Sequence, residues 1–301
     1  MGATRQNLMA GFLFMKRILY SILFVLFCLA VFSYGCADEA NPRYISLAPS
    51  TTEILFALGL NDEIVGVSSF CDYPAQAKAK EKAGSFSQPN FEKILSLKPD
   101  YIFCTGLKQS SVFSQLIRLN LNVYVSDPKN IEELFDSIIE IGKITKKIKE
   151  AQGLVDRMRK EIAEVVLGVN RIAQEKKPKI FIEIWSDPLM TAGKGSLVDE
   201  LFTLAGGINI AGDLKKSYSI FSPEEVIRKN PDFIFLTYMD KEKTIKSVRG
   251  RFGWGQISAI KNNRLYNDID PAILLRPGPR LVEGIKAIHK RLYCLDEKKP
   301  N

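Results

Sequence analysis

Aromatic residues follow several apolar runs of this 301-residue chain. Phe70 and Tyr73 come after the run IVGVSS at 64–69, and Trp185 comes after IFIEI at 180–184. The full set at such loop positions is Phe70, Tyr73, Phe86, Trp185, Tyr218 and Tyr238. Core packing is the alternative role for any one of them. Six such aromatic residues, spread over both halves of the chain, favour a role in the walls of a binding site for a large, flat ligand.

Groups that could catalyse a reaction are sparse. His289 is the one histidine, and the sequence holds no Gly-x-Ser-x-Gly element and no phosphate-binding loop. No cluster of residues has the spacing of metal ligands. The sequence therefore predicts a binding protein rather than an enzyme, with no resident cofactor and no metal.

Two strand–loop–helix passages must position these side chains. An apolar run at 44–47 leads through APSTTE into the helical pattern EILFALGL, and a second run at 180–184 leads through TAGKGS into LVDELFTLAGG. Both patterns end with Gly after the last apolar turn, as helices often do. Alternating strands and helices predict α/β lobes with mainly parallel sheets, Rossmann-like in organisation.

An internal repeat supports two such lobes. FEKILSLKPDYIFCT at 91–105 matches PEEVIRKNPDFIFLT at 223–237, with a constant offset that aligns Glu92 with Glu224. Each copy predicts a helix, a turn at Pro-Asp and a buried strand. Asn90 and Ser222 are the expected N-caps.

A helical span without proline separates the two copies. Residues 131–175 are rich in Lys, Glu, Ile, Leu and Ala, with apolar residues at helical spacing, and predict two helices, of which the second is very long. A single long helix would then bridge two α/β lobes. The predicted segments are a signal peptide at 1–36, an N-terminal lobe at 43–142, a bridging helix at 143–176 and a C-terminal lobe at 177–301.

The N-terminus has the pattern of an export signal. Lys16 and Arg17 precede an uncharged apolar run at 18–34 that ends at Gly35-Cys36. The four residues at 33–36 resemble a lipobox, so lipidation of Cys36 and ordinary cleavage nearby are the two alternatives. We expect a periplasmic or extracytoplasmic protein, whose only attachment to the membrane, if Cys36 is lipidated, would be that lipid anchor.

The predicted mature chain is mildly basic and contains few cysteines. The formal charge of +8 falls to about +5 without the leader, and the basic residues are interspersed with acidic ones, which does not indicate a nucleic-acid partner. Cys71 and Cys104 follow strand runs of one lobe, so we expect that they could form a disulfide, with Cys294 unpaired.

Several motifs together resemble a known family. They are RYISLAPSTTEILFALGL, VGVSSFCDYP, GSFSQPNFEKILSLKPDYI, PLMTAGKGS with AGGINI, FSPEEVIRKNPDFIFLT and LLRPGPRLVEGIKAI, spanning residues 43 to about 295. They resemble the periplasmic cobalamin-binding proteins, within the iron-siderophore and vitamin B12 substrate-binding proteins of ABC importers. The resemblance implies two α/β lobes bridged by one long helix.

The resemblance also implies a ligand and its contacts. Cobalamin binders sandwich the corrin between aromatic side chains of both lobes. The matching positions are Phe70, Phe86, Thr105, Trp185 and Tyr218. Asp270 stands near an acidic residue of the pocket, and Tyr73 belongs to the same aromatic set. A corrinoid, cobalamin or a relative, is therefore the expected ligand.

One glutamate on each lobe docks on arginines of the permease in this family, and the matching residues are Glu92 and Glu224. The implied partner is a permease dimer with its ATPase, to which a monomer would offer two equivalent carboxylates. The alternative is that each glutamate only stabilises the start of its helix.

Two other functions compete with corrinoid binding. An iron-siderophore or haem binder would share the fold, and Arg276, Arg280 and Tyr73 could contribute to its pocket. An exported enzyme on a nitrogenase-like pair of lobes is the second alternative.

Overall fold

The computed structural model describes residues 41–85, 87–106, 111–238 and 245–294. The chain divides into two compact units, Met1–Asn41 and Pro42–Asn301, and every helix and strand named below belongs to the second. None of the helices in these described ranges combines the length and the apolar character that crossing a membrane requires.

The first sheet has four parallel strands in the order β2-β1-β3-β4. The strands are β1 (Tyr44–Ser46), β2 (Ile64–Val67), β3 (Tyr101–Cys104) and β4 (Val123–Val125). Alternate residues of β3 pack on opposite faces: Phe103 joins one apolar core, while Ile102 and Cys104 join another. The sheet is thus covered on both sides, as its apolar runs predict.

Helices of the first half cover these two faces. Those on the Phe103 side include α2 (Pro49–Ala57), α3 (Ala75–Lys78) and α6 (Ile131–Ile144), and those on the other side are α4 (Phe91–Ser96) and α5 (Ser111–Arg118). We call this sheet with its helices the N-terminal lobe.

The second sheet is mixed. Its path is β10-β9-β5-β6-β8, with β7 also pairing β5. The strands are β5 (Lys179–Ser186), β6 (Leu189–Ala192), β7 (Ile208–Asn209), β8 (Tyr218–Ile220), β9 (Phe233–Leu236) and β10 (Leu265–Tyr266). The pairs β5–β6 and β6–β8 are antiparallel and the others are parallel. The sequence did not predict the β5–β6 hairpin, which turns at Asp187-Pro188.

Short and long helices surround the second sheet. They are α8 (Leu197–Leu204), α9 (Pro223–Lys229), α10 (Ile245–Arg249), η2 (Trp254–Gln256), α11 (Ser258–Lys261), α12 (Ala272–Leu275) and α13 (Leu281–Tyr293). Residues of α8 and α13 share a core with Phe233 and Phe235, whereas α9, α10 and η2 pack on the face that holds Ile234. We call this sheet with its helices the C-terminal lobe.

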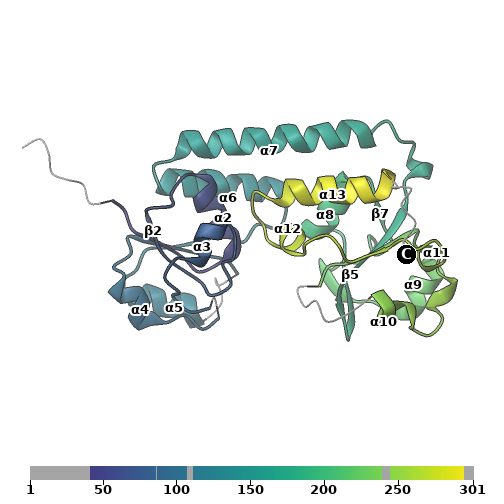
Figure 1. Ribbon diagram of the computed structural model, residues 1–301, viewed down its shortest axis with the longest axis horizontal. Coiled ribbons are helices and arrows are strands. Elements are labelled where there is room, and N and C mark those ends of the chain that lie inside the picture. Colours follow the sequence, from purple (N-terminus) through teal and green to yellow (C-terminus); the bar gives the residue numbers. More distant parts are fainter. Residues whose placement is uncertain (1–40, 86, 107–110, 239–244, 295–301) are drawn as a thin grey trace, which may run out of the picture. The chain divides into compact units, whose positions relative to one another are not determined.

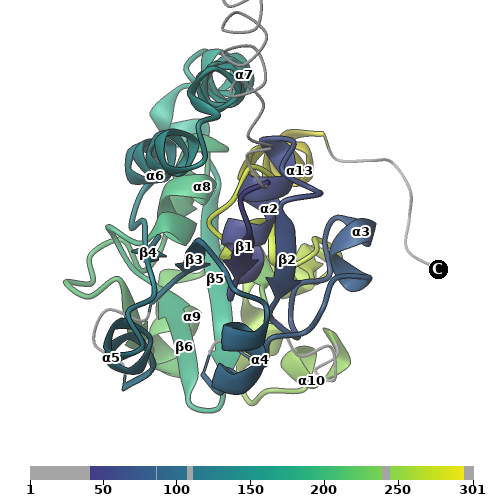
Figure 2. The same ribbon diagram turned by 90° about the vertical axis from the view of Figure 1, so that its left-hand side faces the viewer.

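One long helix joins the lobes. The 22-residue α7 (Ile148–Val169) packs on α6 at one end and on α8 and α13 at the other, and the short η1 (Gln174–Lys176) follows it. Figure 1 shows α7 running along α6 and α13, and Figure 2 shows it end-on beside α6. The predicted architecture of two α/β lobes bridged by a single long helix is confirmed, while the boundaries of the four predicted segments stay a prediction.

The internal repeat extends to individual hydrogen bonds. The carboxylate of Asp100 accepts from the backbone N–H of Arg43 at 2.7 Å, just before β1. The carboxylate of Asp232 accepts from the N–H of Lys179 at 2.9 Å, at the start of β5. In both copies the Pro-Asp turn therefore ties the strand that follows it to the start of its neighbour.

The expected Cys71–Cys104 bridge is wrong. Both thiols are free and buried, and Cys294 is free and exposed. Cys71 belongs to the core on one face of the first sheet and Cys104 to the core on the other face. The sheet separates the two sulfur atoms, which the sequence order of strand ends could not show.

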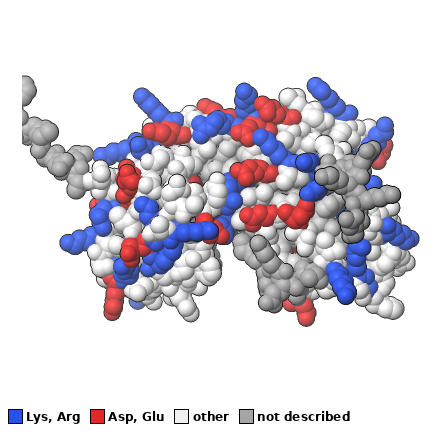
Figure 3. Space-filling model, viewed as in Figure 1, with Lys and Arg blue, Asp and Glu red and all other residues white. Residues whose placement is uncertain are grey.

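Charged side chains of both signs are mixed on one face of the molecule (Figure 3). On the face seen in Figure 3, basic and acidic side chains are interspersed over both lobes. This agrees with a solvated surface rather than a basic stripe of the kind that follows a nucleic-acid backbone.

Candidate ligand-binding site

A hollow of ≈ 310 Å³ lies where the N-terminal lobe meets the segment after α12. Its walls come from the ends of β1, β2 and β3 and from that segment. The lining residues are Ala48, Pro49, Ser50, Phe70, Thr105, Leu275, Arg276 and Pro277. The carboxyl ends of parallel strands are the usual ligand edge of an open α/β sheet, and the volume lies at the lower end of the range for ligand sites.

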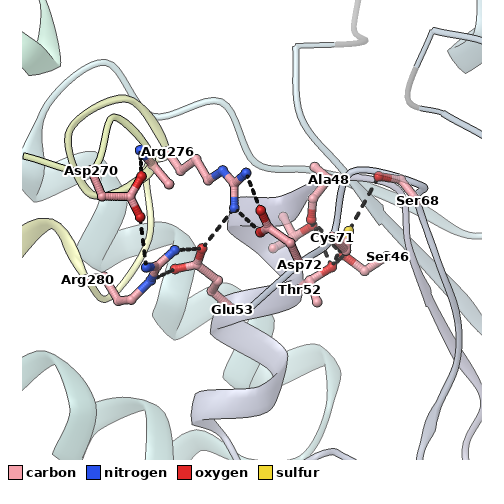
Figure 4. A network of polar contacts seen from close by, with 12 residues as sticks. Ser46, Ala48, Thr52, Glu53, Ser68, Cys71, Asp72, Asp270, Arg276 and Arg280 are labelled. Atoms are coloured by element: carbon pink, nitrogen blue, oxygen red, sulfur yellow. Dashed lines mark hydrogen bonds and ion pairs between the residues drawn. The ribbon is translucent and has the colours of Figure 1, made fainter. Parts of the chain in front are cut away.

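Buried hydroxyls fix the turn from β1 into α2. The Oγ1 of Thr52 lies 2.7 Å from the Oγ of Ser46 and 3.0 Å from the carbonyl oxygen of Ala48. Thr51 donates to the same carbonyl at 3.1 Å. Figure 4 shows Ser46, Ala48 and Thr52 beside Cys71 at the head of this helix. Because these groups are buried and hydrogen-bonded, the first turn of α2 has a fixed position in the hollow's wall.

Phe70 and Thr105 are the predicted ligand residues that line the hollow. Phe70 follows β2, and its side chain, 56% exposed, forms part of the wall of the hollow. Thr105 follows β3 directly. The structure brings these two side chains to one site.

Tyr73 and Asp270 lie beside this hollow rather than in it. Tyr73 lines a second hollow of ≈ 330 Å³, where the guanidinium of Arg280 stacks 3.9 Å from the centre of its ring. The carboxylate of Asp270 accepts from the N–H of Ala272 at 3.0 Å and lies 4.0 Å from Arg280. Asp270 thus caps the start of α12.

The other predicted aromatic residues are not brought to the hollow. Trp185, at the end of β5, donates its indole N–H to the carbonyl of Asp187 at 2.7 Å and is about half exposed. Tyr218, at the start of β8, is also about half exposed. Neither is among the residues that line the hollow. Phe86 lies outside the described residues.

Five charged residues form a network between the lobes, the Glu53 cluster: Glu53, Asp72, Asp270, Arg276 and Arg280. Arg280 donates to both carboxylate oxygens of Glu53, at 2.9 and 2.7 Å. Arg276 donates to both oxygens of Asp72, at 2.5 and 3.2 Å, and lies 3.7 Å from Glu53. Figure 4 shows both guanidinium groups reaching from the C-terminal segment to carboxylates of the N-terminal lobe.

The pKa values in this cluster shift as paired charges should. The hydrogen bond from Arg276 lowers the pKa of Asp72. The hydrogen bond to Glu53 raises the pKa of Arg280. Burial alone would lower the pKa of Arg276, but its bond to Asp72 raises it overall. All of these shifts favour the charged forms, so the pairs persist at neutral pH.

The described residues hold no group of three or more His, Cys, Asp or Glu side chains that could bind a metal ion. His289, the one histidine of the sequence, places its Nδ1 3.1 Å from the carbonyl oxygen of Ala205, and its ring packs on Tyr293. Its position in α13 is structural.

Comparison with known proteins decides the family. The model of the periplasmic binding protein family matches residues 45–271. The chain belongs to the periplasmic binding protein family, the substrate-binding proteins of ABC importers. The prediction of a binding protein rather than an enzyme is thereby confirmed.

Curated relatives of this binding protein cover most of its length. An ABC transporter substrate-binding lipoprotein of Bacillus subtilis, YvrC, is 34% identical over 256 residues, which are 83% of this chain and 80% of the relative. The vitamin B12-binding protein of Vibrio cholerae is 30% identical over 248 residues, or 82% of this chain and 87% of the relative.

Solved structures agree with the fold. A protein from Staphylococcus epidermidis, described as a possible iron-binding (periplasmic solute-binding) protein, superposes with a TM-score of 0.74 at 32% identity, covering 83% of this chain and 98% of that one. The haem-binding protein RhuT of Roseiflexus has a TM-score of 0.73 at 25% identity, covering 85% and 99%.

The two repeated glutamates of the binding protein are both exposed, each in the first turn of its helix. Ser222 donates to the carboxylate of Glu224, which lowers the pKa of that carboxyl group. Ser222 also accepts from the N–H of Glu225 at 3.4 Å, as the equivalent Asn90 accepts from the N–H of Lys93 at 2.9 Å. The two carboxylates are therefore equivalent in position but differ in how they are held.

Sequence reasoning named Arg276 only for the alternative haem or siderophore pocket, and it missed the rest of the wall formed by Ala48–Ser50, Leu275 and Pro277. It also missed Glu53 and Asp72. A signal existed in RPGPR, because two arginines on either side of a rigid Pro-Gly-Pro turn are spaced to reach separate partners. Their carboxylate partners lie more than 200 residues away along the chain, and no local pattern could indicate them.

Proposed function

We propose that this binding protein captures a corrinoid, cobalamin or a close relative, in the hollow lined by Phe70 and Thr105 and delivers it to an ABC importer. The observation that carries the proposal is an exposed aromatic side chain, Phe70, in the wall of a hollow between the lobes. Apolar walls with a few placed polar groups suit a large ring system. The vitamin B12-binding relative of Vibrio cholerae supports the same ligand class.

The second candidate is haem or a ferric siderophore. Arg276 lines the hollow and Arg280 lies next to it, so the site offers positive charge to a ligand with carboxylates or other anionic groups. The structural similarity to a haem-binding protein supports this candidate. Arg276 already pairs with Asp72 and Arg280 with Glu53, which reduces the positive charge available to an anionic ligand. A corrinoid therefore remains the first candidate ligand.

Equilibrium dialysis of the mature protein separates the candidates. Cyanocobalamin, haemin and a ferric siderophore are each dialysed against the protein at equal concentration, and the bound ligand is identified by its visible spectrum. Retention of cyanocobalamin alone supports the proposal. Retention of haemin or the siderophore without cyanocobalamin would replace it with the second candidate.

We also propose how the protein reaches and contacts its importer. The N-terminal pattern of an export signal supports a location outside the cytoplasm, with either lipidation of Cys36, which lies outside the described residues, or ordinary cleavage nearby. The relative named as a lipoprotein supports lipidation. Glu92 and Glu224 are the proposed contacts with the permease dimer, which works with its ATPase, and their exposure leaves them free to meet arginines.

A further inference from the structure

The segment from Leu275 to Arg280 forms one wall of the hollow and lies across the first turn of α2. A Cβ atom added to Gly278 would lie 3.4 Å from the Oε2 of Glu53 and 3.6 Å from the carbonyl oxygen of Ser50. Leu275, Arg276 and Pro277 line the hollow opposite Ala48–Ser50. The position of this segment on α2 therefore determines the width of the hollow.

Little regular structure fixes the segment by itself. The amides of Leu275 and Arg276 bond to the carbonyls of Pro271 and Ala272, in the last turn of α12, and the amide of Leu281 bonds to the carbonyl of Gly278. Pro277 and Pro279 have no N–H to donate. Among the described residues, the two guanidinium groups of the Glu53 cluster make side-chain polar contacts between this segment and the N-terminal lobe.

Glu53 is the centre of these contacts. Its side chain is only 3% exposed. Arg280 donates hydrogen bonds to both of its carboxylate oxygens, and Arg276 lies 3.7 Å from one of them. A buried carboxylate is stable as an anion only when it is well paired, and removing one partner leaves the other charge buried and uncompensated. Glu53 does not line the ligand hollow.

We propose that Glu53 is a positioning residue for ligand binding. By pairing with Arg280 and lying beside Arg276, it orders the 275–280 segment as a fixed wall of the hollow without touching the ligand. The ligand then meets a site that is already formed, and does not have to order that wall at the cost of its own binding energy. This inference rests on the proposed function, because it assumes that the hollow lined by Phe70 is the ligand site.

A matched pair of substitutions tests the proposal. Arg280→Lys keeps the charge but cannot reproduce the two parallel bonds to Glu53. Arg251→Lys does the same to an equivalent pair inside the C-terminal lobe, where Arg251 donates to both oxygens of the fully buried Glu183 at 2.7 and 2.6 Å. Both changes weaken a buried bidentate pair, but only the first loosens the 275–280 segment. Glu53→Gln is the third variant.

Amide hydrogen exchange and ligand titration are the two readouts. In Arg280→Lys and Glu53→Gln we expect faster exchange at Leu275, Arg276 and Leu281, and an apparent Kd raised about tenfold if the ordered wall is present only about a tenth of the time. In Arg251→Lys, thermal stability should fall comparably, with these amides and the Kd unchanged within about twofold.

Two results would overturn the proposal: unchanged exchange at the three amides in Arg280→Lys, or an equal rise in Kd in Arg280→Lys and Arg251→Lys. If the wild-type protein retains no corrinoid, haemin or ferric siderophore, the proposed function fails. The exchange comparison needs no ligand, and it still decides whether Glu53 orders the segment.

Discussion

The two lobes share one plan and differ at the strand ends. In the N-terminal lobe, β1 stops at Ser46 and the chain turns at once into α2, so backbone and small side chains reach the ligand hollow. In the C-terminal lobe, the equivalent strand β5 runs to Ser186 and pairs with β6 in a hairpin before α8 begins. In this lobe a hairpin, which includes Trp185, therefore separates the strand from the helix that follows it.

Because of this difference, the two lobes contribute unequally to the wall of the hollow. The N-terminal lobe provides most of the described wall of the hollow, whereas the C-terminal lobe contributes only the segment at 275–277. The two lobes therefore share the Pro-Asp turns and the repeated glutamates but differ in what they contribute to the hollow.

The largest expected contrast between the lobes is in thiol reactivity. Cys71 and Cys104 of the N-terminal lobe are buried, and Cys294 at the end of the C-terminal lobe is exposed. Burial raises the pKa of Cys104 to about 12. At pH 8 only about one in 10⁴ of its thiols would be the reactive thiolate. Mass spectrometry after alkylation of the native mature protein should find Cys294 modified first, and all three after denaturation. If Cys71 and Cys104 stay unmodified in the denatured, unreduced protein, the predicted disulfide between them would be correct after all.

Docking on the importer tests the equivalence of the two glutamates. We expect Glu92→Ala and Glu224→Ala to weaken binding to the reconstituted importer, by about 2–5 kcal/mol each if the pairs are desolvated and far less if they stay at the rim. Ligand affinity should change less than about twofold, because both side chains are exposed and neither lines the hollow. The losses in docking should add in the double mutant.

The contact between Ser222 and Glu224 sharpens this test. Ser222→Ala removes the hydroxyl that holds Glu224, while Asn90→Ala at the equivalent site removes only the cap of α4. A change in docking rate for Ser222→Ala alone would show that the held carboxylate matters. Normal docking of both glutamate variants would leave Glu92 and Glu224 as helix-start residues.

Stability measurements test the repeated aspartates. Asp100→Ala and Asp232→Ala each remove a carboxylate that accepts from the start of the neighbouring strand. A hydrogen bond to a charged group contributes about 1.5–3 kcal/mol, so similar losses of unfolding free energy in urea are expected. Asn at each position, which keeps an acceptor oxygen, should recover part of the loss. A loss in one lobe only would show that the two turns are not equivalent.

The smallest expected effect is the pH dependence of the Asp72–Arg276 pair. The pKa of Asp72 is lowered by the hydrogen bond from Arg276. The pair therefore contributes stability above the unfolded-state pKa of about 4 and loses it as pH falls through the lower folded-state value. Asp72 is more than half exposed, so solvent screening keeps the effect below about 1 kcal/mol. Asp72→Asn should flatten the acid limb of thermal stability slightly, and an unchanged limb would contradict the pair's role.

Much of the fold could be predicted from the sequence because its signals are local. The repeat, the N-caps Asn90 and Ser222, and the apolar spacing of α7 each depend on residues within a few turns of one another. The β5–β6 hairpin was missed because the residues after β5 also fit a loop before a helix.

The site was predicted only in part for the same reason. Phe70 and Thr105 follow strands, and parallel strand ends must share one edge, so their meeting follows from the fold. Trp185 lies in the β5–β6 hairpin and does not line the described hollow. Glu53 and Arg280 are far apart in the sequence and come together only in the folded chain, so no local pattern indicates that they pair.

The most direct test of the account is calorimetric titration of cyanocobalamin into the mature wild-type protein, Phe70→Ala and Phe252→Ala. Phe70 lines the hollow, whereas Phe252 is fully exposed and lines neither described hollow. We predict that wild type and Phe252→Ala bind alike and that Phe70→Ala binds about tenfold or more weakly, since loss of an aromatic contact in a desolvated site costs about 2 kcal/mol or more. Equal affinity in all three proteins, or no heat with the wild type, would contradict the account.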